Sequence, residues 1–146
     1  MVRITGDVTI AAPVEEVFDL VADGRNEPLY NPRLVRAEKL TDGPVAAGAR
    51  FAATPRGTGA RGTMTVEILE YDRPHRLRND IRSSSMRVDG TLTFRETGAG
   101  TLLRWDWDMR LLGPTRVLTP VLALVGLGWE RRNWLDLKRY LEAGAR

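Results

Sequence analysis

The end of the chain, from Thr101 to Ala143, reads TLLRWDWDMRLLGPTRVLTPVLALVGLGWERRNWLDLKRYLEA. Residues Leu103 to Arg110 alternate between apolar and charged side chains, which is the pattern of a strand with one packed face. After this strand the spacing becomes helical, and a helix is predicted from Pro114 to Ala143. A strand that leads into a long terminal helix predicts a curved sheet that holds the helix, with room for a ligand between them.

The predicted terminal helix carries an apolar stripe at helical spacing, made of Leu118, Leu122, Val125, Trp129, Leu137 and Leu141. Its second half is visibly charged, whereas its first half is apolar nearly all round. A helix that is apolar on every side needs either more than one packing partner or a neighbouring hydrophobic ligand.

The rest of the chain is predicted to form one strand, two short helical segments and the other strands of the sheet. Val2 to Ile10 alternate as a half-buried strand, Pro13 opens a helix that Gly24 ends, and Asn26 to Pro32 are predicted to form a short helical turn. Six further strands are predicted at Leu34–Leu40, Ala49–Thr54, Thr63–Tyr71, Arg76–Arg82, Met86–Arg95 and Thr101–Arg110. The short connections between them favour an antiparallel meander.

The last three predicted strands each have one apolar face and one charged face. The inward residues are expected to be Leu77, Asn79 and Ile81, then Val88, Gly90, Leu92 and Phe94, and finally Leu103, Trp105, Trp107 and Met109. The opposite face carries charges of both signs, which suit cross-strand pairing in water.

Composition limits the possible functions. The 146 residues predict one domain spanning 1–146, and the absence of cysteine excludes disulfides, thiolate metal sites and cysteine nucleophiles. His75 is the only histidine, which excludes a multi-histidine metal cluster, and no metal or cofactor is expected. The N-terminus does not resemble a signal peptide, and the apolar run Val117–Trp129 is too short for a membrane span. We therefore expect a cytoplasmic protein without integral membrane contact.

Several motifs, in order along the whole chain, resemble the START-like (birch-pollen-allergen-like, SRPBCC) superfamily, in particular its bacterial polyketide cyclase/dehydrase and lipid-transport branch. They are Ala12–Phe18, Asn26–Pro32, Leu40–Pro44 with Gly48–Phe51, Glu70–Leu77, Gly100–Trp105 and Leu137–Glu142. The resemblance implies an α+β helix-grip fold, with a seven-stranded curved antiparallel sheet around a long C-terminal helix and two short helices after the first strand. It also implies a small hydrophobic ligand as the partner, with lipid transport among the possible roles and a monomer or weak homodimer as the assembly.

The residues expected to line such a cavity are mostly aromatic and thioether side chains, which suit flat polycyclic or acyl ligands. They are Phe51, Met64, Met86, Trp105, Trp107, Met109, Leu122 and Trp129. The alternative for each is a purely structural place in the core against the final helix.

Three polar residues are further candidates for ligand contact. An inward Asn79 needs hydrogen-bond partners, which a ligand, a neighbouring side chain or water could supply, and Asn133 poses the same question. Tyr30 is a candidate hydroxyl donor or weak general acid, or else a structural cover for one end of the cavity. Tyr30 and Asn79 are the two candidates for a catalytic role.

Other chemical sites are not favoured by the sequence. His75 lies in a tight turn, where a general base would not reach a substrate. Asp106 and Asp108 are flanked by Arg104 and Arg110, which indicates a solvated charge ladder and not a metal site. The arginines are interleaved with acids and lack stacking aromatics, so nucleic-acid binding is not expected.

Three functions remain open: a hydrophobic-ligand binder, which we prefer, a cyclase/dehydratase that closes a polyketide ring by aldol chemistry, and a protein-interaction domain. A binder should have a mostly apolar cavity. A cyclase should have at least two convergent polar groups in the cavity, one with a perturbed pKa. An interaction domain should have a filled interior and an exposed apolar patch.

Overall fold

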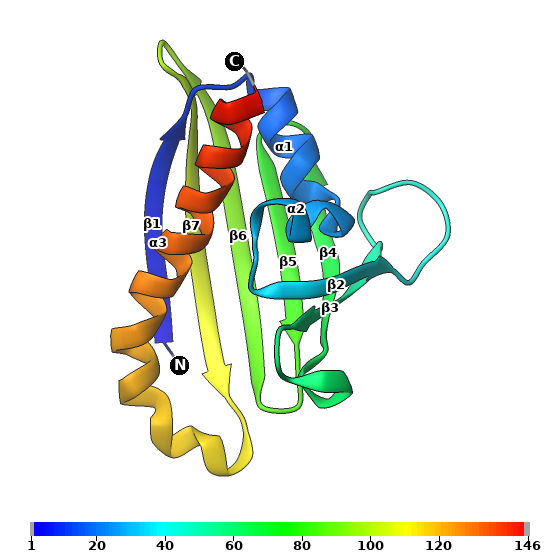
Figure 1. Cartoon of the computed structure of the whole chain (residues 1–146), viewed down its shortest axis with the longest axis vertical. Coiled ribbons are helices and arrows are strands. Elements are labelled where there is room, and N and C mark those ends of the chain that lie inside the picture. Colours follow the sequence, from blue (N-terminus) through cyan, green and yellow to red (C-terminus); the bar gives the residue numbers. More distant parts are fainter. Residues whose placement is uncertain (1, 145–146) are drawn as a thin grey trace.

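The computed structural model describes residues 2–144, and the side chains of residues 122–127 and 129 lie outside the described part. Within it, seven strands form one antiparallel sheet in the order β1-β7-β6-β5-β4-β3-β2 (Figure 1). The strands are β1 (Val2–Ile10), β2 (Leu34–Lys39), β3 (Arg50–Pro55), β4 (Met64–Asp72), β5 (Arg76–Arg82), β6 (Met86–Thr97) and β7 (Gly100–Leu111). The predicted meander and the α+β helix-grip fold are thereby confirmed.

Two helices, α1 (Val14–Ala22) and α2 (Glu27–Tyr30), lie between β1 and β2, joined by the 3-10 turn η1 (Gly24–Asn26). A further 3-10 turn, η2 (Gly59–Gly62), joins β3 to β4. The chain ends in a 3-10 segment, η3 (Gly113–Leu118), and the long helix α3 (Thr119–Gly144). Figure 1 shows α3 running lengthwise across one face of the sheet, with α1 and α2 beside it.

The start of the terminal helix differs from the prediction. The α-helix begins at Thr119 and not at Pro114, which lies in η3. Pro120 then occupies the first turn of α3, where a missing N–H donor costs nothing. Leu118, predicted to belong to the buried stripe, is 52% exposed, whereas Leu137 and Leu141 are buried as predicted. Leu122, Val125 and Trp129 have side chains outside the described part.

The inner face of the sheet contains two glycines that make room for tryptophans. Gly6 is the cross-strand partner of Trp105, and Gly90 is the cross-strand partner of Trp107. A Cβ atom on Gly90 would lie 1.4 Å from Cζ3 of Trp107, so only glycine allows the ring to cover β6 at this point. Asn79 pairs with Gly90 from the other side, so Asn79, Gly90 and Trp107 form one row across three strands.

The outer face carries ion pairs between neighbouring strands, as the charge pattern predicts. Arg3 of β1 lies 2.9 Å from Asp106 of β7, and Arg78 of β5 lies 2.7 Å from Asp89 of β6. These pairs are exposed and contribute little to stability.

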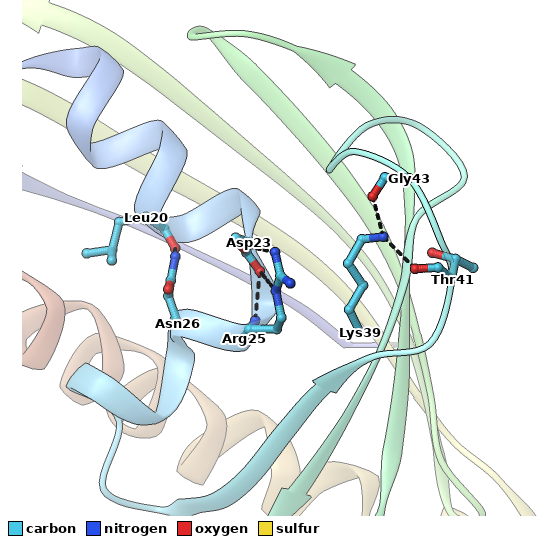
Figure 2. Close-up of polar contacts among 7 residues, drawn as sticks. All are labelled: Leu20, Asp23, Arg25, Asn26, Lys39, Thr41 and Gly43. Atoms are coloured by element: carbon cyan, nitrogen blue, oxygen red, sulfur yellow. Dashed lines mark hydrogen bonds and ion pairs between the residues drawn. The ribbon is translucent and has the colours of Figure 1, made fainter.

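Local polar contacts shape the connection that carries α2 (Figure 2). The Asp23 carboxylate accepts hydrogen bonds from the Arg25 backbone and guanidinium, and Asn26 donates to the Leu20 carbonyl at 3.3 Å. At the end of β2, the Lys39 ammonium donates to the carbonyls of Thr41 and Gly43 and so closes the following loop. The predicted helical turn is thus realised as α2, directly against β2 and α3.

Candidate functional site

A cavity of about 420 Å³ lies between the sheet and the helices α2 and α3. Most of its wall is apolar and comes from alternate residues of successive strands, such as Leu34, Val66, Ile81, Val88 and Leu92. The cavity therefore occupies the position that the helix-grip prediction reserves for a ligand.

Seven of the residues expected from the sequence to contact a ligand line this cavity. They are Tyr30, Met64, Asn79, Met86, Trp107, Met109 and Asn133. They come from α2, β4, β5, β6, β7 and α3, and the curvature of the sheet brings them together.

The structure places two of the other expected residues in the core and not at the cavity. Phe51 is 2% exposed and packs beneath η1, where a Cβ on Gly24 would lie 2.9 Å from its ring. Trp105 stacks on Trp134 with ring centroids 5.8 Å apart. Both residues face inward as predicted, but helical elements cover them. Leu122 and Trp129, the remaining two, have side chains outside the described part.

Glu130 of α3 is the most perturbed acid in the cavity. Burial raises the pKa of its carboxyl group to about 7. A hydrogen bond from Trp107, whose Nε1 lies 2.7 Å from Glu130 Oε2, opposes this shift, and the charge of Glu27 adds to it. This carboxyl group can therefore exchange its proton near neutral pH.

Glu27 and Tyr30 enter the cavity from α2. Burial raises the pKa of Glu27, against the opposing effects of a hydrogen bond from Asn31 and the charge of Arg33. Burial also raises the pKa of the Tyr30 phenol well above its usual value, and Glu27 adds to this shift. Tyr30 is consequently a neutral hydroxyl at physiological pH, able to donate a hydrogen bond.

Arg33 joins the segment before β2 to α3. Its Nη2 atom donates to Asp136 Oδ2 at 2.9 Å and to Asn133 Oδ1. The Arg33–Asp136 pair is three-quarters buried on both sides. The pair therefore connects the segment before β2 with α3, and both contribute to the cavity wall.

Three buried polar atoms have no hydrogen-bond partner in the described structure, and all belong to residues that line the cavity. They are Arg33 Nε, Asn79 Oδ1 and Trp134 Nε1. Trp134 is 7% exposed, and its indole nitrogen lies close enough to Glu130 to lower the pKa of that carboxyl group without reaching hydrogen-bond geometry. Unpaired polar atoms are rare in protein interiors, so three in one apolar wall indicate a place for ligand groups or water.

The lining residues that the sequence reasoning did not propose include four that matter for chemistry: Glu27, Arg33, Glu130 and Trp134. A signal for two of them was present, because Glu130 lies one helical turn before both Asn133 and Trp134 and therefore shares their face. For Glu27 and Arg33 no comparable signal exists, since charged residues in a short turn are normally solvated.

The remaining chemical candidates lie away from the cavity. His75 is exposed in the turn between β4 and β5, as expected. Asp106 pairs with Arg3 on the outer face. Among the described residues no group of three His, Cys, Asp or Glu side chains is placed to hold a metal ion. No helix in the same part of the chain has the length and apolarity needed to cross a membrane.

Solved structures of low sequence identity share this fold. A Thermus thermophilus protein, TTHA0849, has a TM-score of 0.81 at 20% identity, with 99% of each chain covered. A START superfamily protein from Mycobacterium smegmatis has a TM-score of 0.79 at 15% identity over 97% of each chain. The di-domain ARO/CYC BexL of the BE-7585A biosynthetic pathway has a TM-score of 0.74 at 21% identity, covering 97% of this chain and 47% of BexL. A search of curated protein sequences finds no significant match.

The sequence profile of one protein family covers almost the whole chain. It matches residues 1–142, from β1 to the last turn of α3, and its description is Polyketide cyclase / dehydrase and lipid transport. The same range contains every described residue of the cavity wall. The chain is therefore a member of the polyketide cyclase/dehydrase and lipid transport family, with the START-like helix-grip fold.

Proposed function

We propose that the cavity binds a small, mostly apolar molecule that carries a polar end, in the size range of a polyketide, lipid or isoprenoid-like compound. One observation carries the proposal: the residues that line an apolar cavity of about 420 Å³ include three with a buried polar atom that has no hydrogen-bond partner in the described structure. The volume falls within the range of small-molecule sites, which is roughly 300–1,000 Å³.

The polar atoms give the ligand an orientation. Leaving a buried donor or acceptor unpaired costs about 1–3 kcal/mol, so a ligand that satisfies it gains affinity. Asn79 Oδ1 accepts a hydrogen bond, whereas Trp134 Nε1 donates one. The apolar wall, by contrast, contributes affinity in proportion to the buried area and selects only for shape.

Native mass spectrometry of the purified protein, compared with its denatured mass, tests the proposal directly by detecting a retained small molecule. A pair of variants on β3 provides the control. Ala53 lines the cavity, and the neighbouring Ala52 points to the opposite face. We expect Ala53→Phe to abolish ligand retention and ligand-induced thermal shifts, and Ala52→Phe to leave both intact. Equal behaviour of the two variants would contradict the proposed site.

A second function, cyclisation and dehydration of a polyketide chain, is favoured by Glu27 and Glu130. Two acids share the cavity, and a pKa near 7 for Glu130 suits general acid–base catalysis at neutral pH. In an aldol closure, the Glu130 carboxylate would remove a proton from a carbon beside a carbonyl group. The enolate would attack a second carbonyl carbon, and the Glu27 carboxyl group, whose pKa is raised by burial, would donate its proton to the new alkoxide.

Product analysis with a synthetic poly-β-keto thioester tests this second function. Loss of general base catalysis costs typically about a hundredfold or more in rate. Glu130→Gln should therefore abolish most ring closure, and Glu38→Gln, on the exposed surface of β2, should not. If the wild-type protein binds the substrate without accelerating closure, the binding function stands alone.

A further inference from the structure

The cavity wall carries more acidic than basic side chains. The described lining residues with charged side chains are Glu27, Glu130 and Arg33. Arg33 is already paired with Asp136, which in turn lies 3.7 Å from the exposed Arg139. Glu27 and Glu130 feel the positive charge of Arg33 at a distance, but neither forms an ion pair in the described structure.

Buried carboxylates are normally paired with a cation. Here the hydrogen-bond donors nearest to the acids are neutral: the Trp107 indole donates to Glu130, and the Asn31 amide donates to Glu27. Both donors favour the ionised form of the acid they contact without cancelling its charge. Burial nevertheless outweighs these donors and raises the pKa of both acids. The ionised carboxylates therefore lack a dedicated positive partner among the described lining residues of the cavity.

The aromatic residues of the cavity could also contact a positively charged ligand group. The rings of Trp107 and Trp134 lie 6.4 Å apart in a stacked arrangement, and both line the cavity. The face of an indole ring attracts a cation that lies within about 6 Å of it. Trp134 is 7% exposed, and its Nε1–H donor has no partner in the described structure, so it marks a place for an acceptor atom of the ligand or for water, separate from the ammonium group.

We propose that the polar end of the ligand is a basic amine, held as an ammonium ion by the carboxylates of Glu130 and Glu27. The inference rests on the proposed binding function and narrows it to apolar amines. It also excludes anionic ligands, such as fatty acids, because a ligand carboxylate would be repelled by both acids.

The pH dependence of binding follows from the charged groups that face Glu130, which are Glu27 from α2 and Arg33 from the segment before β2. In the free protein the pKa of Glu130 is about 7, so at lower pH an ammonium ion must displace a proton to bind. Linkage then predicts an affinity about tenfold weaker at about pH 6 than at about pH 8. A neutral ligand should show no such dependence.

Isothermal titration of three matched compounds tests the inference: naphthylethylamine, naphthylethanol and naphthylacetate. A charge-assisted hydrogen bond is worth roughly a tenfold gain in affinity or more. We expect the amine to bind about tenfold more tightly than the alcohol near pH 8, and the acid to bind most weakly of the three.

Isosteric variants identify the residues responsible. Glu130→Gln keeps an acceptor for Trp107, and Glu27→Gln keeps an acceptor for Asn31. Each should weaken amine binding about tenfold and leave alcohol binding within about twofold, whereas Glu38→Gln should change neither. Two independent variants keep the test decisive if one fails to fold.

The possible failures are distinguishable. If the alcohol or the acid binds as tightly as the amine, the amine inference is overturned and the hydrophobic cavity stands. If amine preference persists in both glutamine variants, the carboxylates are not its source and the inference is again overturned. If none of the three compounds binds, both the inference and the binding function fail.

Discussion

Trp107 donates its indole hydrogen to Glu130 across 2.7 Å and so links strand β7 to helix α3 at the wall of the cavity. The bond favours the ionised carboxylate, whereas burial favours the protonated acid, and burial prevails. The protonation equilibrium of Glu130 is therefore coupled to the folding equilibrium and to the binding of a ligand next to this carboxyl group.

Replacement of Glu130 by glutamine should stabilise the protein at alkaline pH. The folded-state pKa of about 7 exceeds the usual value of 4.5, so the folded state holds a proton that the unfolded state has lost between these values. The free energy of unfolding of the wild type should thus fall as pH rises through this window. Glu130→Gln avoids this loss and should gain about 2–3 kcal/mol over the wild type at about pH 8.

Urea denaturation of both proteins at two pH values provides the measurement. Near pH 4.5 Glu130 is protonated in the folded state, so there the difference between variant and wild type should largely vanish. A glutamine variant that is less stable than the wild type at alkaline pH would show that the ionised carboxylate is stabilised by its surroundings.

Replacement of Trp107 by phenylalanine should raise the pKa of Glu130 further above about 7. The indole hydrogen bond opposes the effect of burial, and phenylalanine removes the bond while keeping an apolar ring. NMR titration of isotopically labelled glutamate carboxyl carbons reports the value. Trp105→Phe is the matched control, because Trp105 stacks on Trp134 and no hydrogen bond joins it to Glu130 in the described structure. A lowered pKa in Trp107→Phe would refute this account.

A methyl group at Gly90 should disturb the cavity wall. The Cβ of alanine would lie 1.4 Å from the Trp107 ring, which must therefore move. Such overpacking costs about 1–3 kcal/mol in the free energy of unfolding. Gly98→Ala is the control, because a Cβ there meets no atom within 4 Å. Chemical denaturation should show a loss for Gly90→Ala and almost none for Gly98→Ala, and equal losses would argue against a packing effect.

The bridge between Arg33 and Asp136 should contribute measurably to stability. Its side chains are 24% and 19% exposed, compared with 71% and 49% in the Arg36–Glu38 pair. A double-mutant cycle with Arg33→Gln and Asp136→Asn should give a coupling energy of about 1 kcal/mol or more. The same cycle with Arg36→Gln and Glu38→Gln should give less than about 0.5 kcal/mol. Similar coupling energies for the two pairs would mean that the Arg33–Asp136 bridge contributes no more to stability than an exposed ion pair.

Much of the fold was predictable because it depends on local periodicity. The alternation in β5, β6 and β7 assigned each side chain to a face of the sheet, and burial of Leu77, Leu92 and Leu103 confirms the assignment. The helical start was misplaced because a proline is compatible both with a 3-10 turn, as at Pro114, and with the first turn of an α-helix, as at Pro120.

The cavity was predictable only in part. An inward position on a strand does not distinguish a core residue from a lining residue, because both face the same side of the sheet. Phe51 and Trp105 ended in the core, since η1 and Trp134 cover them, whereas Trp107 remained at the cavity. The difference arises from elements that are distant in sequence.

The amino-acid sequence by itself determined the order of the strands, the face that each side chain occupies and the family to which the chain belongs, because these follow from short-range patterns. The tertiary structure alone decided which charged residues are buried. Glu27, Arg33 and Glu130 look like ordinary surface residues in the sequence, and only the approach of α2 and α3 over the curved sheet encloses them in one cavity. Desolvation there raises the pKa of both acids, and that depends on the enclosing atoms and not on neighbours in the chain.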